Sequence, residues 1–272
     1  MSLDKLMRGY VNPDLDIDMR AFNVMKSPVP CSSDVWISPS QSNIIKKTKM
    51  PGKRPQNGVK MVWEFLQYRI LHELFKEYGE RLRDQFRIEV PSAVGVQPRD
   101  WTIYTEFAPG FILSLFDEHA KDVSEVKHLN EITSPLESSI AIHLGIISRI
   151  KELEGIYHHD YSLSHLIFDP NTPTLNMFDL ENTRYLNDKE LVAAESRKVY
   201  GRWLRIARNR GADLRKLGCC YEFGRDIVPK KASVGYVEMA RKVGEEFDVN
   251  IQITKGIVDG YDLSLAHPKV KD

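Results

Sequence analysis

The chain of 272 residues is long enough to bury a real core, and its 38 Lys and Arg balance 38 Asp and Glu. This balance gives no reason to expect nucleic acid or an anionic membrane as a partner, and every apolar run is far shorter than the ~18 residues that span a bilayer. The N-terminus lacks the apolar core of a secretory signal, and the three cysteines form neither a disulfide framework nor a metal-binding pair. We therefore expect a soluble, cytoplasmic protein without a transmembrane segment.

The first part of the chain is predicted to form strands around one main helix. In residues 59–78, large apolar side chains recur at steps of three and four, which is one face of a helix. They are Trp63, Leu66, Ile70, Leu74 and Tyr78. Strands are predicted on the basis of β-rich composition and turn residues. Their ranges are 21–25, 34–38, 42–48, 88–96 and 100–107, with a loop at 50–58.

The rest of the chain is predicted to be mostly helical. A short helix is expected at 111–119, a longer one at 135–153 and another at 188–208, with Asn187 or Asp188 as its cap. Residues 211–272 are mixed in pattern. The predicted elements are strands and one helix in the first part of the chain and mostly helices in the rest. This order predicts an α+β protein with two unequal lobes, 1–107 and 108–272.

The segment GIYHHDYSLSHLIFD, followed by LNMFDLENTR, carries the main functional signal. Asp160 and Asp179 are each flanked by hydrophobic residues, and the turn-forming DPNTP lies between them. Enzymes that transfer a phosphoryl group from ATP need such a pair, because one carboxylate orients the acceptor hydroxyl and the other holds Mg²⁺. The pattern predicts two loops joined by a β-hairpin.

Over residues 20–210 the order of features resembles the protein-kinase-like superfamily. The resemblance implies a bilobed fold, with a small β-rich N-terminal lobe that has one main helix and a mostly helical C-terminal lobe. It also implies ATP and Mg²⁺ as cofactors, with Asp160 as the acceptor-orienting base and Asp179 as the metal ligand. Lys46 would reach the ATP phosphates and Glu64 would pair with it, although Lys47, Lys49 and Glu73 are rival candidates. The backbone of Glu106, Phe107 and Ala108 would contact the adenine.

Two departures from the superfamily pattern are informative. Position 165 is His where the catalytic loop usually has Asn, and HHDYSLSH and MFDLENTR are most similar to the lipopolysaccharide core heptose kinases. Imidazole is a poor Mg²⁺ ligand, so His165 either binds the metal or hydrogen-bonds a phosphate or Asp179. The sequence also lacks GxGxxG, and the backbone near Ser32 and Ser33 would have to cover the phosphates.

The acceptor is predicted from the short stretch after Asp179. The next helix follows within about ten residues and no Ala-Pro-Glu is present, whereas peptide-recognising kinases keep a longer segment there. We therefore expect a sugar-like or other small hydroxylated acceptor. The alternatives are an atypical protein Ser/Thr kinase and a pseudokinase-like binding or scaffold module. A basic run in the following helix is either a patch for an anionic acceptor or a solvated face. Its members are Arg197, Lys198, Arg202, Arg205, Arg208 and Arg210.

The remaining histidines of the motif suggest less chemistry. The resemblance implies that His158 is a packed brace of the catalytic loop, and His159 is expected to be exposed. His158, Asp160 and a later His would also match the two-His-one-carboxylate site of Fe(II) enzymes. The only His after residue 165 is His267, five residues from the end, which leaves no room for the strand that usually follows such a ligand.

Overall fold

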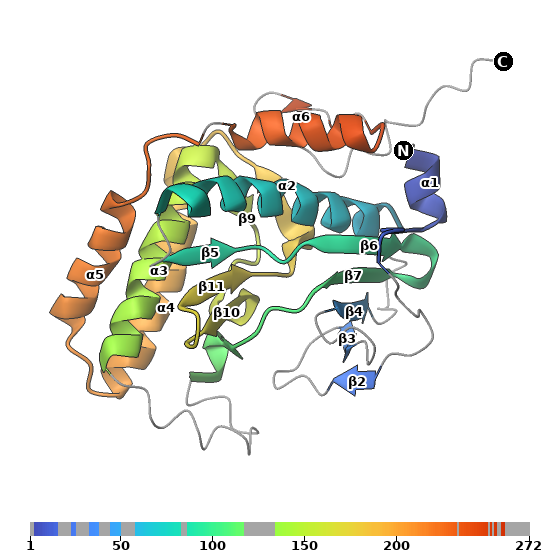
Figure 1. Cartoon of the computed structure of the whole chain (residues 1–272). Coiled ribbons are helices and arrows are strands. Elements are labelled where there is room, and N and C mark those ends of the chain that lie inside the picture. The colour runs from blue at the N-terminus through green and yellow to red at the C-terminus, as the bar shows by residue number, and fades with distance from the viewer. Residues whose placement is uncertain are drawn as a thin grey trace.

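The computed structural model describes residues 3–15, 23–25, 33–37, 44–49, 58–82, 86–116, 134–232, 234–249, 251, 253–254 and 257–258. It confirms a mixed α+β protein, in which α3, α4 and α5 gather at one end, and α1 (Leu3–Arg8), α2 and α6 lie along the strands of the other (Figure 1). Within the described residues, no helix is both long enough and apolar enough to cross a membrane.

The larger sheet has six strands in the order β1-β6-β7-β4-β3-β2, and every neighbouring pair is antiparallel. The predicted strands at 21–25, 34–38 and 42–48 match β2, β3 and β4. In the pairing of β4 with β7, Lys46 lies opposite Tyr104 and Ile44 lies opposite Glu106. The strand bounds are β1 Tyr10–Val11, β2 Asn23–Met25, β3 Ser33–Ile37, β4 Ile44–Lys49, β6 Ala93–Gln97 and β7 Thr102–Glu106.

The predicted strand at 88–96 is two strands that belong to different sheets. Pro91 lies between β5 (Arg87–Glu89) and β6, and its missing N–H prevents a continuous ladder. β5 pairs in parallel with β11 (Thr174–Met177) in a second, four-stranded sheet of order β5-β11-β10-β8. The other two strands of this sheet are β8 Phe111–Ile112 and β10 Leu166–Asp169.

The predicted helix at 111–119 is wrong in its first residues. Phe111 and Ile112 form β8, which pairs with β10, and a short 3-10 turn, η2 (Leu113–Phe116), follows; residues 117–119 lie outside the described part. The Phe111 ring packs edge-on against Phe116, with centroids 4.7 Å apart. Gly110 has φ +115° and touches the backbone of Phe168 so closely that a Cβ would overlap it, so the chain enters β8 in a conformation that only glycine accepts easily.

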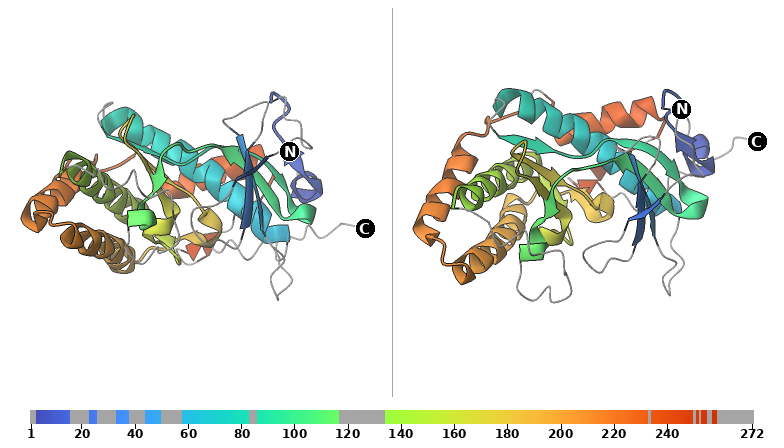
Figure 2. Two further views of the ribbon diagram at one scale, coloured as in Figure 1. Left: turned by 90° about the horizontal axis from the view of Figure 1, so that it is seen from below. Right: turned by 60° about the horizontal axis from the view of Figure 1, so that its bottom comes forward.

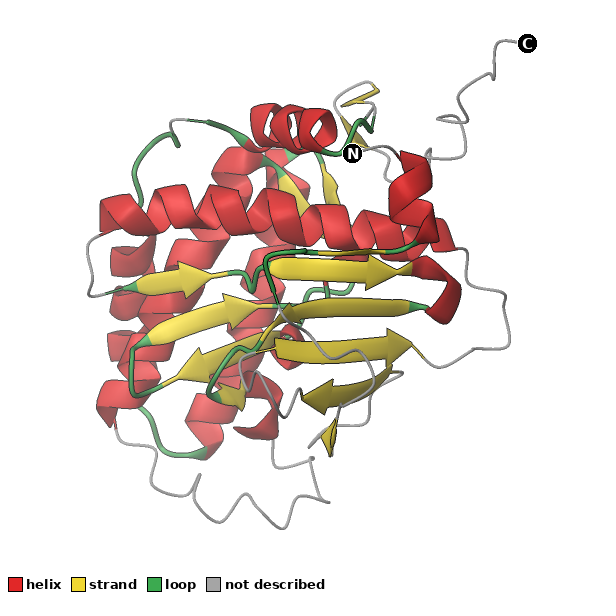
Figure 3. Ribbon diagram, turned by 45° about the vertical axis from the view of Figure 1, so that its right-hand side comes forward, coloured by secondary structure: helices red, strands yellow, loops and turns green. Residues whose placement is uncertain are grey.

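The main helix of the strand-rich end, α2 (Gly58–Leu82), is buried on more than one face. All five apolar residues predicted for its inner stripe are buried, but so are Glu64 and Gln67. The outer face is covered by α6 (Tyr236–Glu246), which lies along α2 (Figures 1 and 3). The Tyr236 hydroxyl donates to Gln67 Oε1 at 2.8 Å. The sequence left the role of residues 211–272 open; within this segment, α6 closes the core over α2.

Three helices form the other end of the molecule: α3 (Ser134–Glu154), α4 (Lys189–Asn209) and α5 (Leu214–Asp226) (Figure 2). The helices predicted at 135–153 and 188–208 are confirmed, and Asp188 caps α4 by accepting from the N–H groups of Glu190 and Leu191. α3 and α5 approach closely at two glycines. A Cβ on Gly145 would overlap the carbonyl of Tyr221, and one on Gly224 would overlap the carbonyl of Ile142.

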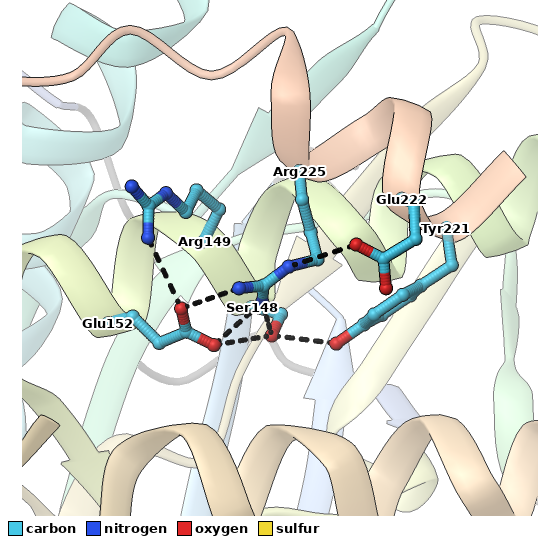
Figure 4. Close-up of polar contacts among 6 residues, drawn as sticks. All are labelled: Ser148, Arg149, Glu152, Tyr221, Glu222 and Arg225. Atoms are coloured by element: carbon cyan, nitrogen blue, oxygen red, sulfur yellow. Dashed lines mark hydrogen bonds and ion pairs between the residues drawn. The ribbon is translucent and has the colours of Figure 1, made fainter. Parts of the chain in front are cut away.

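A polar network also joins α3 to α5 (Figure 4). Arg225 donates to both oxygens of the nearly buried Glu152 carboxylate, at 2.6 and 2.8 Å. Ser148 Oγ accepts from the Tyr221 hydroxyl at 2.8 Å and from Arg225 at 3.1 Å. Charge-assisted bidentate pairs are among the stronger polar contacts in proteins, so this network adds directional contacts to the glycine-mediated packing.

Candidate functional site

The predicted hairpin is present, and it brings the two motif loops together. β10 and β11 pair antiparallel between the loops. β9 (Ile156–His158), which precedes the first loop, pairs antiparallel with β12 (Thr183–Tyr185), which follows the second loop, and His158 lies opposite Thr183. The first loop, 159–165, and the second loop, 178–182, are therefore held side by side.

Three predicted residues meet at these loops. His165 Nε2 lies 3.5 Å from Asp179 Oδ2, and their side chains are 16% and 29% exposed. Asp160 is exposed, and its Oδ2 accepts a hydrogen bond from Asn182 Nδ2 at 2.6 Å. The site therefore presents two carboxylates to solvent, each contacted by a side chain from the neighbouring loop.

Asp179 has a left-handed backbone conformation, φ 61° and ψ 59°, which is uncommon for a residue with a side chain. Its N–H donates to the Tyr68 hydroxyl at 2.9 Å, and its carbonyl accepts from His158 Nε2 at 2.7 Å. The peptide groups on both sides of the residue are therefore fixed. Such strain persists where the surrounding structure determines it, and it is often found at functional sites.

His158 is the buried brace that the resemblance implied. Burial lowers the pKa of His158 to about 4, with the nearby Lys151 charge acting in the same direction, so the ring is neutral at pH 7. A carbonyl only accepts hydrogen bonds, so Nε2 is the protonated ring nitrogen of His158 and donates to the carbonyl oxygen of Asp179. His159 is exposed, as expected.

The helix that bears Glu64 is tied to the second loop through Tyr68 and to the strand after it through Trp63. Glu64 and Tyr68 are one turn apart on α2, and Trp63 Nε1 donates to the carbonyl of Thr183 at 3.3 Å. The Glu64 side chain is fully buried, whereas Glu73 is only half-buried. Of the two rival carboxylates, Glu64 is the one that the fold turns inward.

The other predicted nucleotide contacts are described less fully. Lys46 lies in β4, but its side chain and those of Lys47 and Lys49 lie outside the described part, as do Ser32 and the side chain of Ser33. Glu106 ends β7, and its carboxylate accepts from the N–H of Ser92 at 3.3 Å. Phe107 is exposed and Ala108 is buried.

Sequence reasoning missed several residues at the site. Asn182 and Tyr68 contact the two carboxylate loops directly, and Lys151 and Glu195 lie beneath the first loop. Asn182 lies within the MFDLENTR segment, three residues after Asp179. A polar side chain so close to the proposed metal ligand could have identified it as a site residue. Tyr68, Lys151 and Glu195 lie on three different helices, and no local pattern relates them.

The basic residues of α4, together with Arg210 directly after it, form no defined binding site within the described part of the chain. Five of them are exposed, and Arg210 lies 3.8 Å from Glu137 at the start of α3. A role for them in binding an anionic acceptor stays a prediction.

The donor set suits a magnesium ion that is shared with phosphates. Among the described residues, no three His, Cys, Asp or Glu side chains are grouped to hold a metal. Mg²⁺ at phosphoryl-transfer sites is commonly held by one or two carboxylates together with substrate phosphates and water. Asp179 supplies a hard carboxylate of this kind, whereas the imidazole of His165 is better suited to a hydrogen bond.

The two carboxylates have different surroundings and hence different chemical capacities. Asp160 is exposed and positioned by an amide, so it is able to accept a hydrogen bond from an incoming hydroxyl. Asp179 is fixed through its backbone and presents its carboxylate next to His165.

A scan against protein-family models found no matching family, and a search of curated proteins found no match to the sequence.

Proposed function

We propose that this protein is an ATP-dependent phosphotransferase with a bilobed protein-kinase-like fold, which moves the γ-phosphoryl group to an alcohol oxygen. One observation carries the proposal: Asp160 and Asp179 lie on adjacent loops joined by a hairpin, and Tyr68 ties the second loop to the helix that bears the buried Glu64. A carboxylate for the acceptor, another for the metal and a buried acid on a nearby helix are three of the parts that kinase-like phosphoryl transfer uses.

In this proposal, Asp160 accepts the hydrogen bond of the acceptor hydroxyl. As the new O–P bond forms and the bond to the ADP oxygen breaks, the hydroxyl proton passes to Asp160. Asn182 holds the Asp160 carboxylate in position, and Asp179 provides the metal ligand. Bound Mg²⁺ would neutralise charge on the phosphates. His165 orients Asp179 rather than taking the metal itself.

The nucleotide is proposed to lie between the two sheets. The chain passes from β7 of the six-stranded sheet to β8 of the four-stranded sheet through Glu106, Phe107 and Ala108, which supports a hinge at these residues. Lys46 is two residues beyond Ile44, whose backbone pairs with Glu106. The strand of the proposed phosphate-binding lysine therefore lies next to the proposed adenine-binding segment.

A small acceptor is favoured by the segment after Asp179. The 3-10 turn η5 (Leu180–Asn182) leads directly into β12, which is paired with β9, and α4 begins at Lys189. This leaves little free backbone on which an extended peptide would lie. We therefore propose a sugar-like or other small hydroxylated molecule.

Labelled ATP with Mg²⁺, supplied with a panel of sugars, phosphosugars and generic protein substrates, tests the proposal. We expect a small acceptor to be labelled, Asp160→Ala and Asp179→Asn to reduce labelling by at least a hundredfold, and Asp179→Asn to remove its Mg²⁺ dependence. Asp188→Asn is the matched control, because Asn caps a helix as well as Asp does.

If only proteins are labelled, and this labelling is lost in Asp160→Ala, the proposal of a small acceptor is wrong and the proposal of kinase activity stands. Binding of Mg-ATP without transfer to any acceptor or to water would instead favour a pseudokinase-like module.

A further inference from the structure

Beneath the first motif loop lies a fully buried lysine. Lys151, near the end of α3, is 0% exposed, and its Nζ donates to Glu195 Oε2 on α4 at 2.6 Å. The same Nζ lies 3.3 Å from the centroid of the Tyr161 ring. An ammonium group over the face of a buried aromatic ring is attracted by the electron-rich face.

The partner carboxylate is shared with the backbone of the loop. Both oxygens of Glu195 lie 3.2 Å from the backbone nitrogen of His158, whose N–H they accept. Lys151 therefore fixes a carboxylate that in turn fixes the strand leading into the loop.

Asp160 is held from both sides by this arrangement. His158, whose N–H is accepted by Glu195, is two residues before Asp160. Tyr161, whose ring covers the Lys151 ammonium group, directly follows Asp160. Tyr161 is also buried, and its N–H donates to the carbonyl of His158 at 2.8 Å. The backbone around the exposed Asp160 is therefore anchored to α3 and α4.

Stability alone is a poor explanation for this pair. Burying an ammonium and a carboxylate costs several kcal/mol per ion, roughly, and the attraction between them commonly does no more than repay that cost. The neighbouring Glu152 points to α5 instead, so α3 uses adjacent residues for two different contacts. The contacts of Lys151 lead to the motif segment: its Nζ binds Glu195, which accepts the N–H of His158, and lies over the ring of Tyr161.

We infer that Lys151 is a positioning residue for the reaction: its buried ammonium group holds Glu195 and Tyr161, and thereby fixes the backbone that presents Asp160. This inference rests on the proposed phosphoryl transfer for its catalytic consequence, but the anchoring of the loop is testable without it.

The catalytic test compares Lys151→Met with Arg149→Met. Arg149 is on the same helix, is partly exposed and contacts Glu152 at 3.5 Å. Arg149→Met is therefore the matched control, because it also removes one positive charge from α3. We expect Lys151→Met to lower kcat at least tenfold and to change the KM for ATP less than twofold, because a misplaced Asp160 affects the transfer step and not nucleotide binding. Arg149→Met should leave both constants within twofold of the native values. Equal kcat and KM in Lys151→Met and native protein would overturn the inference.

The second test measures hydrogen exchange of the backbone N–H of His158. Lys151→Met should raise its exchange rate at least tenfold, while Arg149→Met leaves it unchanged. If Lys151→Met does not fold, the uncharged pair Lys151→Met/Glu195→Gln replaces it and is expected to give the same two effects.

The two tests separate the inference from the proposed function. Native protein that transfers no phosphoryl group, combined with faster exchange at His158 in the variant, would refute the kinase proposal and support the anchoring role. Unchanged exchange would overturn the anchoring role, whatever the turnover.

Discussion

The hydroxyl of Tyr68 on α2 accepts a hydrogen bond from the backbone N–H of Asp179, over 2.9 Å. This bond connects the helix that carries Glu64 to the loop that carries the proposed metal ligand. The position of α2 and the conformation of Asp179 are therefore coupled through one side chain.

Replacing Tyr68 by Phe should lower kcat/KM for phosphoryl transfer about tenfold while costing about 1 kcal/mol of stability. The N–H of Asp179 loses its partner, so the loop is held less firmly. Steady-state kinetics and urea unfolding check this. Tyr185→Phe is the control, because its ring stacks on Tyr236 and the substitution keeps that stack. Equal kinetics in the two variants would show that the Tyr68 bond has no catalytic consequence.

The left-handed backbone of Asp179 predicts an unusual stability order. Asp179→Gly should be more stable than Asp179→Ala by about 1 kcal/mol, because both lose the carboxylate and only glycine adopts this conformation without strain. Both variants should lose Mg²⁺-dependent turnover. Urea unfolding of the two proteins provides the comparison, and equal midpoints would mean that the residue is not left-handed in solution.

The nucleotide-binding lysine is predicted from strand alternation. Successive residues of a β-strand belong to opposite faces of its sheet, and Lys46 and Lys47 are successive in β4. Lys46→Met should therefore weaken ATP binding at least tenfold, while Lys47→Met changes it little. Titration calorimetry with Mg-ATP measures both. Greater sensitivity at Lys47 would mean that the face assignment of the strand is reversed.

The contact between α3 and α5 predicts opposite effects for two glycines on the same helix. Gly224→Ala should destabilise the protein by roughly 3 kcal/mol, because its Cβ has no space beside the carbonyl of Ile142. Gly218→Ala should be neutral or stabilising by up to about 1 kcal/mol, since nothing lies near its Cβ and alanine favours the helix. Thermal and urea unfolding give both values, and similar losses in the two variants would refute the close helix packing.

Lys151 should give stability a distinctive alkaline pH dependence. Burial lowers the pKa of Lys151 to about 8, and the Glu195 charge opposes that shift, whereas the unfolded chain keeps a value near 10.4. Between these pH values the unfolded state binds more protons, so this group makes stability rise with pH, by about 1 kcal/mol for each pH unit. Below pH 8 its contribution is constant.

The measurement is the free energy of unfolding of native protein minus that of Lys151→Met, from pH 7 to pH 10. The difference should move in favour of the native protein above pH 8, and subtraction removes the contributions of other groups. Parallel curves would show that Lys151 titrates normally.

Local sequence determined those elements whose signal is contained within a few turns or one hairpin. The apolar steps of Trp63, Leu66 and Ile70 correctly predicted the inner face of α2, and Asp188 correctly predicted the start of α4. The motif hairpin also followed from sequence, because its turn residues and both apolar strands are contiguous. From these, Asp160, His165 and Asp179 were expected together, and the structure places them on adjacent loops, with His165 beside Asp179 and Asp160 bonded to Asn182.

Tertiary structure decided the features that depend on distant partners. Phe111 and Ile112 form a strand because β10 offers a ladder, and Gln67 is buried because α6 returns from far along the chain and places Tyr236 against it. Asn182, Tyr68 and Lys151 gain their roles from partners that are 22, 111 and 44 residues away: the Asp160 carboxylate, the backbone N–H of Asp179 and the Glu195 carboxylate. Periodicity reports only which face of an element is apolar, whereas the partner that a buried polar group meets is set by long-range packing.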